Sequence, residues 1–357
     1  MVIGLEATGY LNRNPTGIAH YTREIIAAIT KLKHTEIVHF YKLSRWKQRR
    51  LRLVAPNNRW HFGNINLNFK KIDISHTLDN HFLNVRNSRK IITIHDLAAA
   101  KPENQINQYS SHNARETLLR KIEFLNKNSD GFITVSNATK VDLMELCDVS
   151  DSKIKVVHIA PVKRQPNNQD EENILSQFKL KSKQYLLFVG SISIRKNLLN
   201  LIHAYAAGKF DKDYELVLAG SFSMGAESIV ELIHHYKLQD RVKILGYVPD
   251  DYLNALYKHS QAFLFPTYYE GFGIPIVEAM LSGVPVLIGN RGAAPEIADG
   301  NAILSDPFSV ESISDGIRKT IEFPATAIEK AKLHAEQFTW ERTANKTMEY
   351  YMEILGK

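Results

Sequence analysis

The chain has 357 residues, of which 44% are hydrophobic and 23% are charged, a composition typical of soluble globular proteins. This length exceeds what one hydrophobic core usually supports, so we expect two domains. The single cysteine, Cys147, excludes an intramolecular disulfide, and no run approaches the roughly 18 apolar residues that a membrane span needs.

The net charge of +7 is unevenly distributed along the chain. Residues 1–165 carry 26 Lys and Arg against 14 Asp and Glu, a net +12, whereas the remainder carries 19 against 24, a net −5. This asymmetry indicates that the first half meets an anionic partner. The N-terminal residues lack the basic segment of a signal peptide. We therefore expect a cytoplasmic protein, or one held peripherally on the inner face of the plasma membrane.

Predicted strands and helices alternate through the first half. A strand at 2–6 precedes a loop that ends at Gly17, where a helix begins. The other predicted strands lie at 37–43, 72–75, 91–94, 131–135 and 154–159, and the helices at 17–33, 112–128 and 137–146. The strand at 91–94 places His95 at its carboxyl end, which is where doubly wound folds bind ligands.

A basic stretch at 42–52 interleaves cations with Trp46 and two leucines. Such a segment fits an anionic membrane surface or a pyrophosphate-linked lipid, and it also fits a solvated charged face. Nucleic acid is disfavoured as a partner, because no RRM, zinc or helix-turn-helix signature accompanies the stretch.

The alternation restarts after a polar segment at 163–173, which we interpret as a linker. Predicted strands follow at 185–189, 215–219, 242–245, 261–266 and 284–288, and helices at 199–206, 229–236, 250–259, 275–282 and 339–355. Alternating strands and helices predict a parallel, doubly wound sheet in each half. Thr339 is the expected N-cap of the final helix.

Two motifs in the second half suit a phosphorylated ligand. In the first, Gly190 and Ser191 follow a strand, and Arg195 and Lys196 stand at the next helix N-terminus, which is the arrangement of a diphosphate clamp. The alternative is that these are two surface cations.

The second motif is the nonapeptide EGFGIPIVE at 270–278, where Glu270 precedes a glycine turn and Glu278 is expected in the first helical turn. The backbone amides of the turn favour negative charge or dense hydroxyl groups. Alternatively, Glu278 complements the helix dipole and Glu270 is a solvated loop residue.

Glu270 and Glu278, with seven residues between them, resemble the E-x7-E signature of retaining GT-B glycosyltransferases. The continuation EAMLSGVPV at 278–286 is similar to the same family, which includes bacterial mannosyltransferases and sucrose synthases. The resemblance covers nearly the whole chain and is densest from 186 to 307. It implies an α/β fold of two doubly wound, Rossmann-like parallel-sheet domains facing a cleft. Residues 1–165 would form the acceptor-side domain and 166–338 the nucleotide-sugar donor domain, with a helix in 339–357 crossing back to the first.

The resemblance also implies roles for individual residues. Arg195 and Lys196 would bind the donor phosphates, Glu270 the sugar hydroxyls and Glu278 the ribose. His95 would face the transferred sugar, and the backbone near Val248 would meet the base. The remaining implied donor-binding residues are Gly17, Gly190, Ser191, Gly271, Phe272, Gly273 and Ile274. The chain departs from the family pattern at Ala19, where a second glycine is common, and at 159–162, where a polar turn is usual.

The function expected from this resemblance is a retaining, metal-independent glycosyltransferase without a cofactor. Asp211 and Asp213 match the D-x-D pattern of the other glycosyltransferase fold, but no carboxylate cluster surrounds them. The segments at 292–296 and 305–307 resemble mannosyltransferases of surface polysaccharide assembly. They favour GDP-mannose over UDP- or dTDP-sugars as the donor, and a glycan linked to polyprenyl diphosphate as the acceptor. The alternatives are a GT-B sugar-nucleotide epimerase and a non-catalytic sugar-nucleotide-binding assembly protein.

Overall fold

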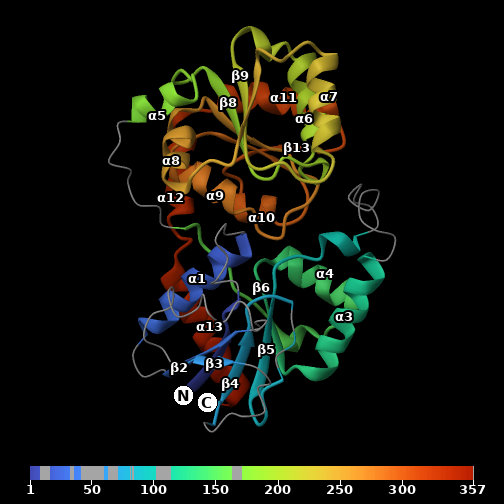
Figure 1. The fold of residues 1–357 in the computed structure, drawn as a ribbon, viewed down its shortest axis with the longest axis vertical. Coiled ribbons are helices and arrows are strands. Elements are labelled where there is room, and N and C mark those ends of the chain that lie inside the picture. Colours follow the sequence, from blue (N-terminus) through green and yellow to red (C-terminus); the bar gives the residue numbers. More distant parts are fainter. Residues whose placement is uncertain are drawn as a thin grey trace. The chain divides into compact units, whose positions relative to one another are not determined.

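The computed structural model describes residues 1–8, 17–32, 36–41, 60–62, 71–80, 82, 84–101, 114–162 and 171–356. The chain divides into two compact units, each built on a parallel sheet (Figure 1). Unit 1 comprises residues 1–100, 114–162 and 338–357, and unit 2 comprises residues 101–113 and 163–337.

Unit 1 contains a seven-stranded sheet in the order β3-β2-β1-β4-β5-β6-β7, with every described pairing parallel. Its helices and strands are β1 (Val2–Glu6), α1 (Gly17–Thr30), β2 (Glu36–Tyr41), β3 (Trp60–Phe62), β4 (Ile74–Thr77), β5 (Arg89–Ile94), α3 (Ala114–Asn128), β6 (Gly131–Thr134), α4 (Asn137–Cys147), β7 (Ile154–Val156) and α13 (Trp340–Leu355). Helix α13 packs against α1, and α3 packs against α4, so helices cover both faces of the sheet (Figure 1).

Because both faces are covered, the central strands of unit 1 are buried along their lengths. All residues of β4 and β6 are buried, and so are the last four of β5. Ser136 caps α4 as predicted, since its side chain accepts a hydrogen bond from the Thr139 amide.

Several predicted boundaries in unit 1 were wrong. Helix α1 ends at Thr30 rather than 33, and β4 begins two residues later than expected. The last strand stops at Val156 rather than 159, because after the Val157 amide bonds the Thr134 carbonyl the chain leaves the edge of the sheet.

Unit 2 contains a six-stranded parallel sheet in the order β10-β9-β8-β11-β12-β13. Its helices and strands are α5 (Glu171–Gln177), β8 (Tyr185–Val189), α6 (Leu198–Ala207), β9 (Glu215–Ala219), α7 (Ala226–His235), β10 (Val242–Gly246), α8 (Asp250–His259), β11 (Ala262–Phe265), α9 (Ile274–Leu281), β12 (Val286–Gly289), α10 (Ala294–Ala298), β13 (Ile303–Ser305), α11 (Val310–Ile321) and α12 (Ala325–Ala335).

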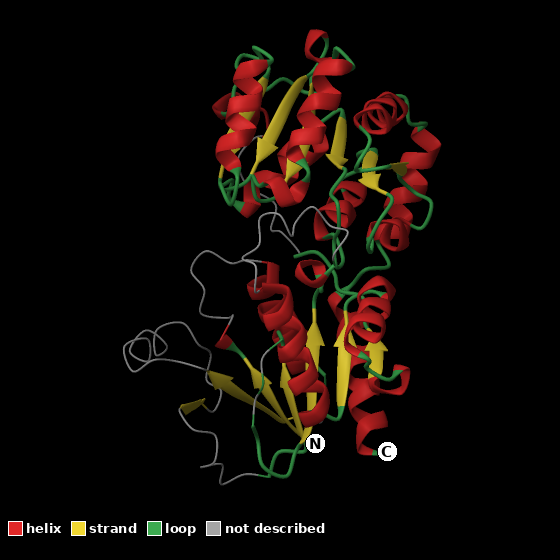
Figure 2. Cartoon of the chain, turned by 90° about the vertical axis from the view of Figure 1, so that its right-hand side faces the viewer, coloured by secondary structure: helices red, strands yellow, loops and turns green. Residues whose placement is uncertain are grey.

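The strand order of unit 2 reverses between β8 and β11, which are sequence-distant neighbours in the sheet. Helices α6, α7 and α11 pack together, whereas α8, α10 and α12 pack around α9 (Figure 1). Figure 2 shows helices on both sides of the strands of this unit. In open parallel sheets, ligands bind beyond the carboxyl ends of the strands at such a reversal. This reversal is therefore where the topology alone places a ligand site.

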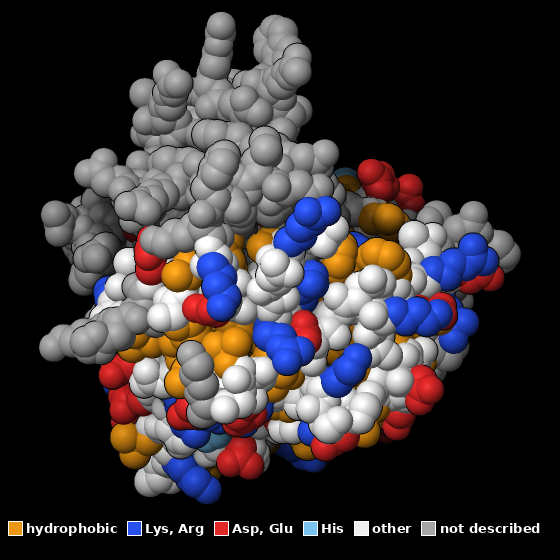
Figure 3. All heavy atoms as spheres, turned by 90° about the horizontal axis from the view of Figure 1, so that it is seen from below, with side chains coloured by type: hydrophobic (Ala, Val, Ile, Leu, Met, Phe, Trp, Pro, Cys, Tyr) orange, Lys and Arg blue, Asp and Glu red, His pale blue; other side chains and the backbone are white. Residues whose placement is uncertain are grey.

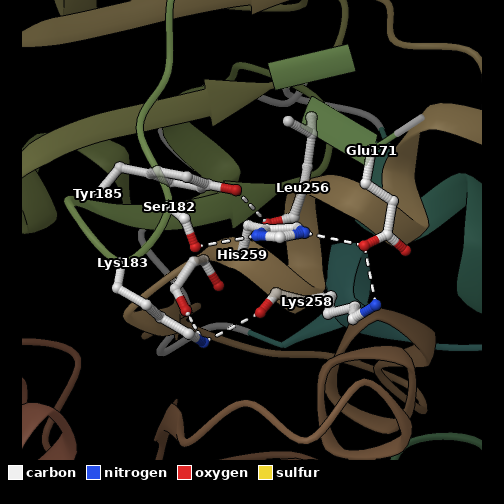
Figure 4. A network of polar contacts seen from close by, with 8 residues as sticks. Glu171, Ser182, Lys183, Tyr185, Leu256, Lys258 and His259 are labelled. Atoms are coloured by element: carbon white, nitrogen blue, oxygen red, sulfur yellow. Dashed lines mark hydrogen bonds and ion pairs between the residues drawn. The ribbon is translucent and has the colours of Figure 1, made fainter. Parts of the chain in front are cut away.

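The predicted linker was wrong at its C-terminal end, because α5 begins at Glu171; residues 163–170 lie outside the described residues. Figure 4 shows what holds Glu171: its carboxylate accepts hydrogen bonds from Lys258 Nζ at 2.8 Å and His259 Nε2 at 2.9 Å. Both bonds lower the pKa of Glu171. His259 Nδ1 lies 2.9 Å from the Ser182 hydroxyl, which gives a Ser–His–Glu series. Because Ser182 precedes β8, the series lies at the amino end of that strand and fastens α5 to the end of α8.

Candidate functional site

Glycines bring the backbone close together at the carboxyl ends of the unit 2 strands. A Cβ added at Gly220 would collide with the Gly190 carbonyl oxygen, and φ at Gly220 is 156°. Gly292, with φ 63°, lies against the loop after β11, where an added Cβ would be 2.8 Å from the Glu270 carbonyl oxygen. The Ala293 amide donates to that same oxygen at 3.0 Å. The backbone at Glu270 is thus held in place from the loop after β12.

Lys196 and Glu270 form an ion pair at the reversal of the sheet, with Nζ 2.7 Å from Oε1. Their side chains are only 12% and 11% exposed, and the Lys196 ammonium also lies 5.2 Å from the centre of the Phe265 ring. The sequence interpretation gave these residues separate ligands and did not foresee that they bind each other. In the structure, the two charges neutralise one another in a largely dry environment.

Arg195 precedes Lys196 in a 3₁₀ turn, Ile194–Lys196, and its side chain is half-buried. Among the described residues, Arg195 has no hydrogen-bond or ion-pair partner. Both cations stand just before a helix, as expected from the sequence, because Asn197 adopts a left-handed conformation, φ 62°, and α6 begins at Leu198. Arg195 is therefore a cation whose guanidinium is not neutralised by the described part of the chain.

Asn197 fixes this turn and was missed by the sequence interpretation. Its side chain is fully buried, and Nδ2 donates to the carbonyl oxygens of Pro266 and Pro307, both at 2.7 Å. One amide thus ties the turn to the loops that follow β11 and β13. The available signal was an asparagine after two cations, since Asn tolerates the left-handed conformation better than most residues.

Helix α9 begins at Ile274 after Gly273, whose φ of 93° requires glycine. Glu278 was expected in the first turn of the helix, but it is the fifth residue of α9. The alternative, an interaction with the helix dipole, is therefore disfavoured, because that effect falls off within the first turn. Glu278 is 8% exposed, and the Tyr257 hydroxyl donates to its Oε2 at 3.0 Å. Tyr257 comes from α8, which follows the buried Val248.

In unit 1, His95 follows β5 and is half-buried. Its Nε2–H donates to the Leu78 carbonyl oxygen at 2.9 Å, and burial lowers its pKa despite the opposing effect of that bond and of Asp79. The imidazole is therefore neutral near pH 7, with Nδ1 as an acceptor. Gly17 begins α1, and no described residue has an atom within 4 Å of a Cβ added there; the loop before it, 9–16, lies outside the described residues.

The remaining sequence predictions bear on metals and membranes. Within the described residues, no group of three or more His, Cys, Asp or Glu side chains is placed to hold a metal ion. No helix in the described part of the chain is long and apolar enough to cross a membrane. The basic stretch 42–52 lies outside the described residues. On the face drawn in Figure 3, the described Lys and Arg side chains are spread apart, and several lie beside acidic ones.

The two parallel-sheet units match known glycosyltransferase structures along their whole length. Sucrose-phosphate synthase from Thermosynechococcus elongatus superposes with a TM-score of 0.75 at 18% identity, covering 99% of both chains. HepE of Anabaena, determined with UDP and glucose, superposes with a TM-score of 0.73 at 17% identity, again covering 99% of both. The fold is the GT-B fold of nucleotide-sugar-dependent glycosyltransferases, as the sequence predicted.

Sequence comparison narrows this class. Residues 169–335 match the family model described as "Glycosyl transferases group 1". O-antigen chain mannosyltransferase B of Escherichia coli is 27% identical over 284 residues, which is 76% of this chain and 72% of that protein. The chain is a GT-B glycosyltransferase similar to bacterial mannosyltransferases, and the predicted enzyme class is confirmed.

Proposed function

We propose that this chain transfers mannose from GDP-mannose to a growing bacterial surface polysaccharide, without a metal and with retention at the anomeric carbon. The observation that carries the proposal is the cluster of Arg195, Lys196 and Glu270 at the reversal of the unit 2 sheet. Two cations beside one carboxylate suit a ligand that carries a diphosphate next to a hydroxyl-rich sugar. The choice of mannose rests on the similarity to the E. coli mannosyltransferase.

The ion pair suggests how the donor enters. The diphosphate first meets Arg195 and then replaces Glu270 as the partner of Lys196. Glu270, released from the ammonium, accepts hydrogen bonds from the sugar hydroxyls. Lys196 is thus never left as an unpaired charge in a site where its side chain is 12% exposed.

In the reaction, the bond between the anomeric carbon and the diphosphate oxygen breaks, and an acceptor hydroxyl forms the new bond on the same face. Negative charge grows on the departing diphosphate, where Arg195 and Lys196 stabilise it; removing one such donor typically costs about 3–4 kcal/mol of transition-state stabilisation. Glu278 binds the ribose, and the neutral His95 imidazole accepts a hydrogen bond from the transferred sugar at Nδ1. The acceptor is a glycan linked to polyprenyl diphosphate, which suits the positive charge of the first half.

A thermal-shift panel of GDP, UDP, dTDP and ADP tests the donor half of the proposal. We expect GDP to raise the melting temperature most, because a ligand at 100 times its Kd adds about 2.7 kcal/mol to the stability of the folded state. The Arg195→Ala variant is the control and should show a smaller shift. No shift with any diphosphate would refute the proposal.

Turnover distinguishes transfer from the alternatives. With GDP-mannose and a polyprenyl-diphosphate-linked glycan, we expect mannosylated product with retained configuration, formed equally well in EDTA. Interconversion of free UDP-sugars would instead identify an epimerase. Donor binding with neither transfer nor slow hydrolysis would identify a non-catalytic protein.

A further inference from the structure

A chain of polar side chains runs through the buried core of unit 1 and joins two helices to the sheet. The Tyr351 hydroxyl of α13 lies 2.5 Å from His76 Nδ1 in β4, and His76 Nε2 lies 2.8 Å from the Thr93 hydroxyl in β5. The Thr93 hydroxyl in turn lies 3.2 Å from the Tyr21 hydroxyl of α1. All four residues are at most 2% exposed.

The members of this chain are all neutral near pH 7. Burial lowers the pKa of His76 to about 3 and raises that of Tyr21 to about 12, and the pKa of Tyr351 is raised as well. A neutral imidazole offers one donor and one acceptor. Whichever tautomer His76 adopts, one ring nitrogen donates and the other accepts, so the Tyr351 and Thr93 hydroxyls take opposite roles toward the imidazole, and either hydroxyl can donate across the contact between Thr93 and Tyr21.

The last member of the chain touches His95. The Tyr21 ring meets the His95 imidazole edge-on, with the ring centres 4.7 Å apart and the planes at 83°, and the Trp340 ring lies 5.9 Å from Tyr21 on another side. The Tyr21 ring is held at its hydroxyl end by Thr93, and His95 is held at Nε2 by the Leu78 carbonyl. The imidazole is thus fixed by a hydrogen bond at one nitrogen and by an aromatic ring against its side.

We propose that Tyr21 is a positioning residue for His95, and that α13 acts on the orientation of His95 through Tyr351, His76 and Thr93. The consequence for turnover rests on the proposed role of His95 at the transferred sugar, whereas the positioning itself does not. A polar chain in a parallel-sheet core is expensive unless every member is satisfied, and when satisfied it specifies one arrangement. Here the chain of hydrogen-bonded side chains ends at Tyr21, whose ring contacts His95.

Neighbouring tyrosines on α13 provide a matched test. Tyr350 and Tyr351 are both buried, but the Tyr350 hydroxyl donates to the Lys153 carbonyl at 2.7 Å, also interacts with the Phe132 backbone, and lies outside the chain of polar side chains. We expect Tyr350→Phe and Tyr351→Phe to lose similar stability. Only Tyr351→Phe should lower kcat, by about 10- to 100-fold, the scale of a small misplacement at a reacting centre. GDP affinity should be unchanged in both.

Thr93→Val cuts the chain at its middle with almost no change of shape, and Thr93→Ser restores the hydroxyl. We expect the valine variant to behave like Tyr351→Phe and the serine variant like the wild type. This pair keeps the test decisive if Tyr351→Phe fails to fold. Equal kcat together with equal His95 imidazole NMR signals in the valine and serine variants would overturn the proposal.

Imidazole NMR reports on His95 without any need for activity. The His95 signals among those of the 14 histidines can be assigned from their absence in His95→Gln. We expect Tyr21→Leu to shift the His95 signals strongly, and Tyr351→Phe and Thr93→Val to shift them measurably. The controls Tyr350→Phe and Thr93→Ser should leave the His95 signals unchanged. Unchanged His95 signals in Tyr21→Leu would overturn the positioning role. Shifted signals with normal kcat would leave it standing and refute the role of His95 at the sugar.

Discussion

Replacing Glu270 by Gln should strengthen the binding of free nucleoside diphosphate while it lowers turnover. In the wild type, the phosphate must displace a carboxylate from Lys196, and that bond, 2.7 Å long and nearly buried, is charge-assisted. Bonds to charged groups contribute about 1.5–3 kcal/mol, and we place the pair with two charged partners at the upper end of this range and the ammonium-to-amide bond of the variant at the lower end. The difference of about 1–1.5 kcal/mol predicts a Kd about 5- to 12-fold lower in Glu270→Gln.

The same substitution should lower the stability of the free protein. Removing one partner of a buried ion pair typically costs about 3–5 kcal/mol; the retained amide and the other contacts of Lys196 reduce this figure. Bound diphosphate supplies the missing negative charge, so the melting-temperature increase with GDP should be larger in the variant than in the wild type.

Isothermal titration calorimetry with GDP measures the affinity directly, and donor turnover is measured in parallel. The matched control is Glu278→Gln, which also removes one largely buried carboxylate but leaves the Lys196 ion pair intact. We expect that control to bind GDP more weakly than the wild type. If Glu270→Gln bound GDP as weakly as or more weakly than the wild type, the displacement of Glu270 by the diphosphate would be wrong.

Three further predictions follow from other contacts. Arg195→Ala should weaken GDP and GDP-mannose alike, by about 10-fold or more, because a hydrogen bond to a charged group contributes about 1.5–3 kcal/mol; unchanged calorimetric affinity would contradict its place in the diphosphate site. Tyr257→Phe should lower the affinity for GDP a few-fold, because the Tyr257 hydroxyl orients Glu278 through a hydrogen bond of 3.0 Å. An unchanged affinity for GDP would show that this bond has no role in binding. His76 has a folded pKa of about 3, below its ordinary value of 6.5, so the unfolded state binds more protons between these values and stability falls as the pH falls. Between pH 7 and pH 5, the unfolding free energy of His76→Gln should therefore fall by about 2 kcal/mol less than that of the wild type, as measured by urea denaturation. If the unfolding free energies of the two proteins changed in parallel with pH, His76 would not be the source of the pH dependence.

Much of the fold was predictable because its signals are local. Apolar runs of four to six residues between helical patterns identified five of the six strands of unit 2, and the predicted strands at 185–189 and 215–219 and helix at 250–259 match β8, β9 and α8 in full. The short edge strand β13 was not predicted. Element ends were less predictable. The chain leaves a strand or helix where its neighbours stop offering hydrogen bonds, as after Val156, and that depends on the sheet rather than on the segment.

The sequence by itself determined which chemistry gathers at the strand ends of unit 2, because Arg195 and Glu270 each follow a recognisable strand and a parallel sheet brings its carboxyl ends to one edge. In the same way it placed His95 at the carboxyl end of a strand in the sheet of unit 1. Only the tertiary structure decided which of these groups bind one another. Lys196 and Glu270 are 74 positions apart, and His76 and Tyr351 are 275 apart, and no local pattern records either contact. Buried polar atoms take the partners that packing brings within reach. The pairing of charges in the candidate site therefore depends on the folded units and cannot be predicted from the sequence motifs that contain these residues.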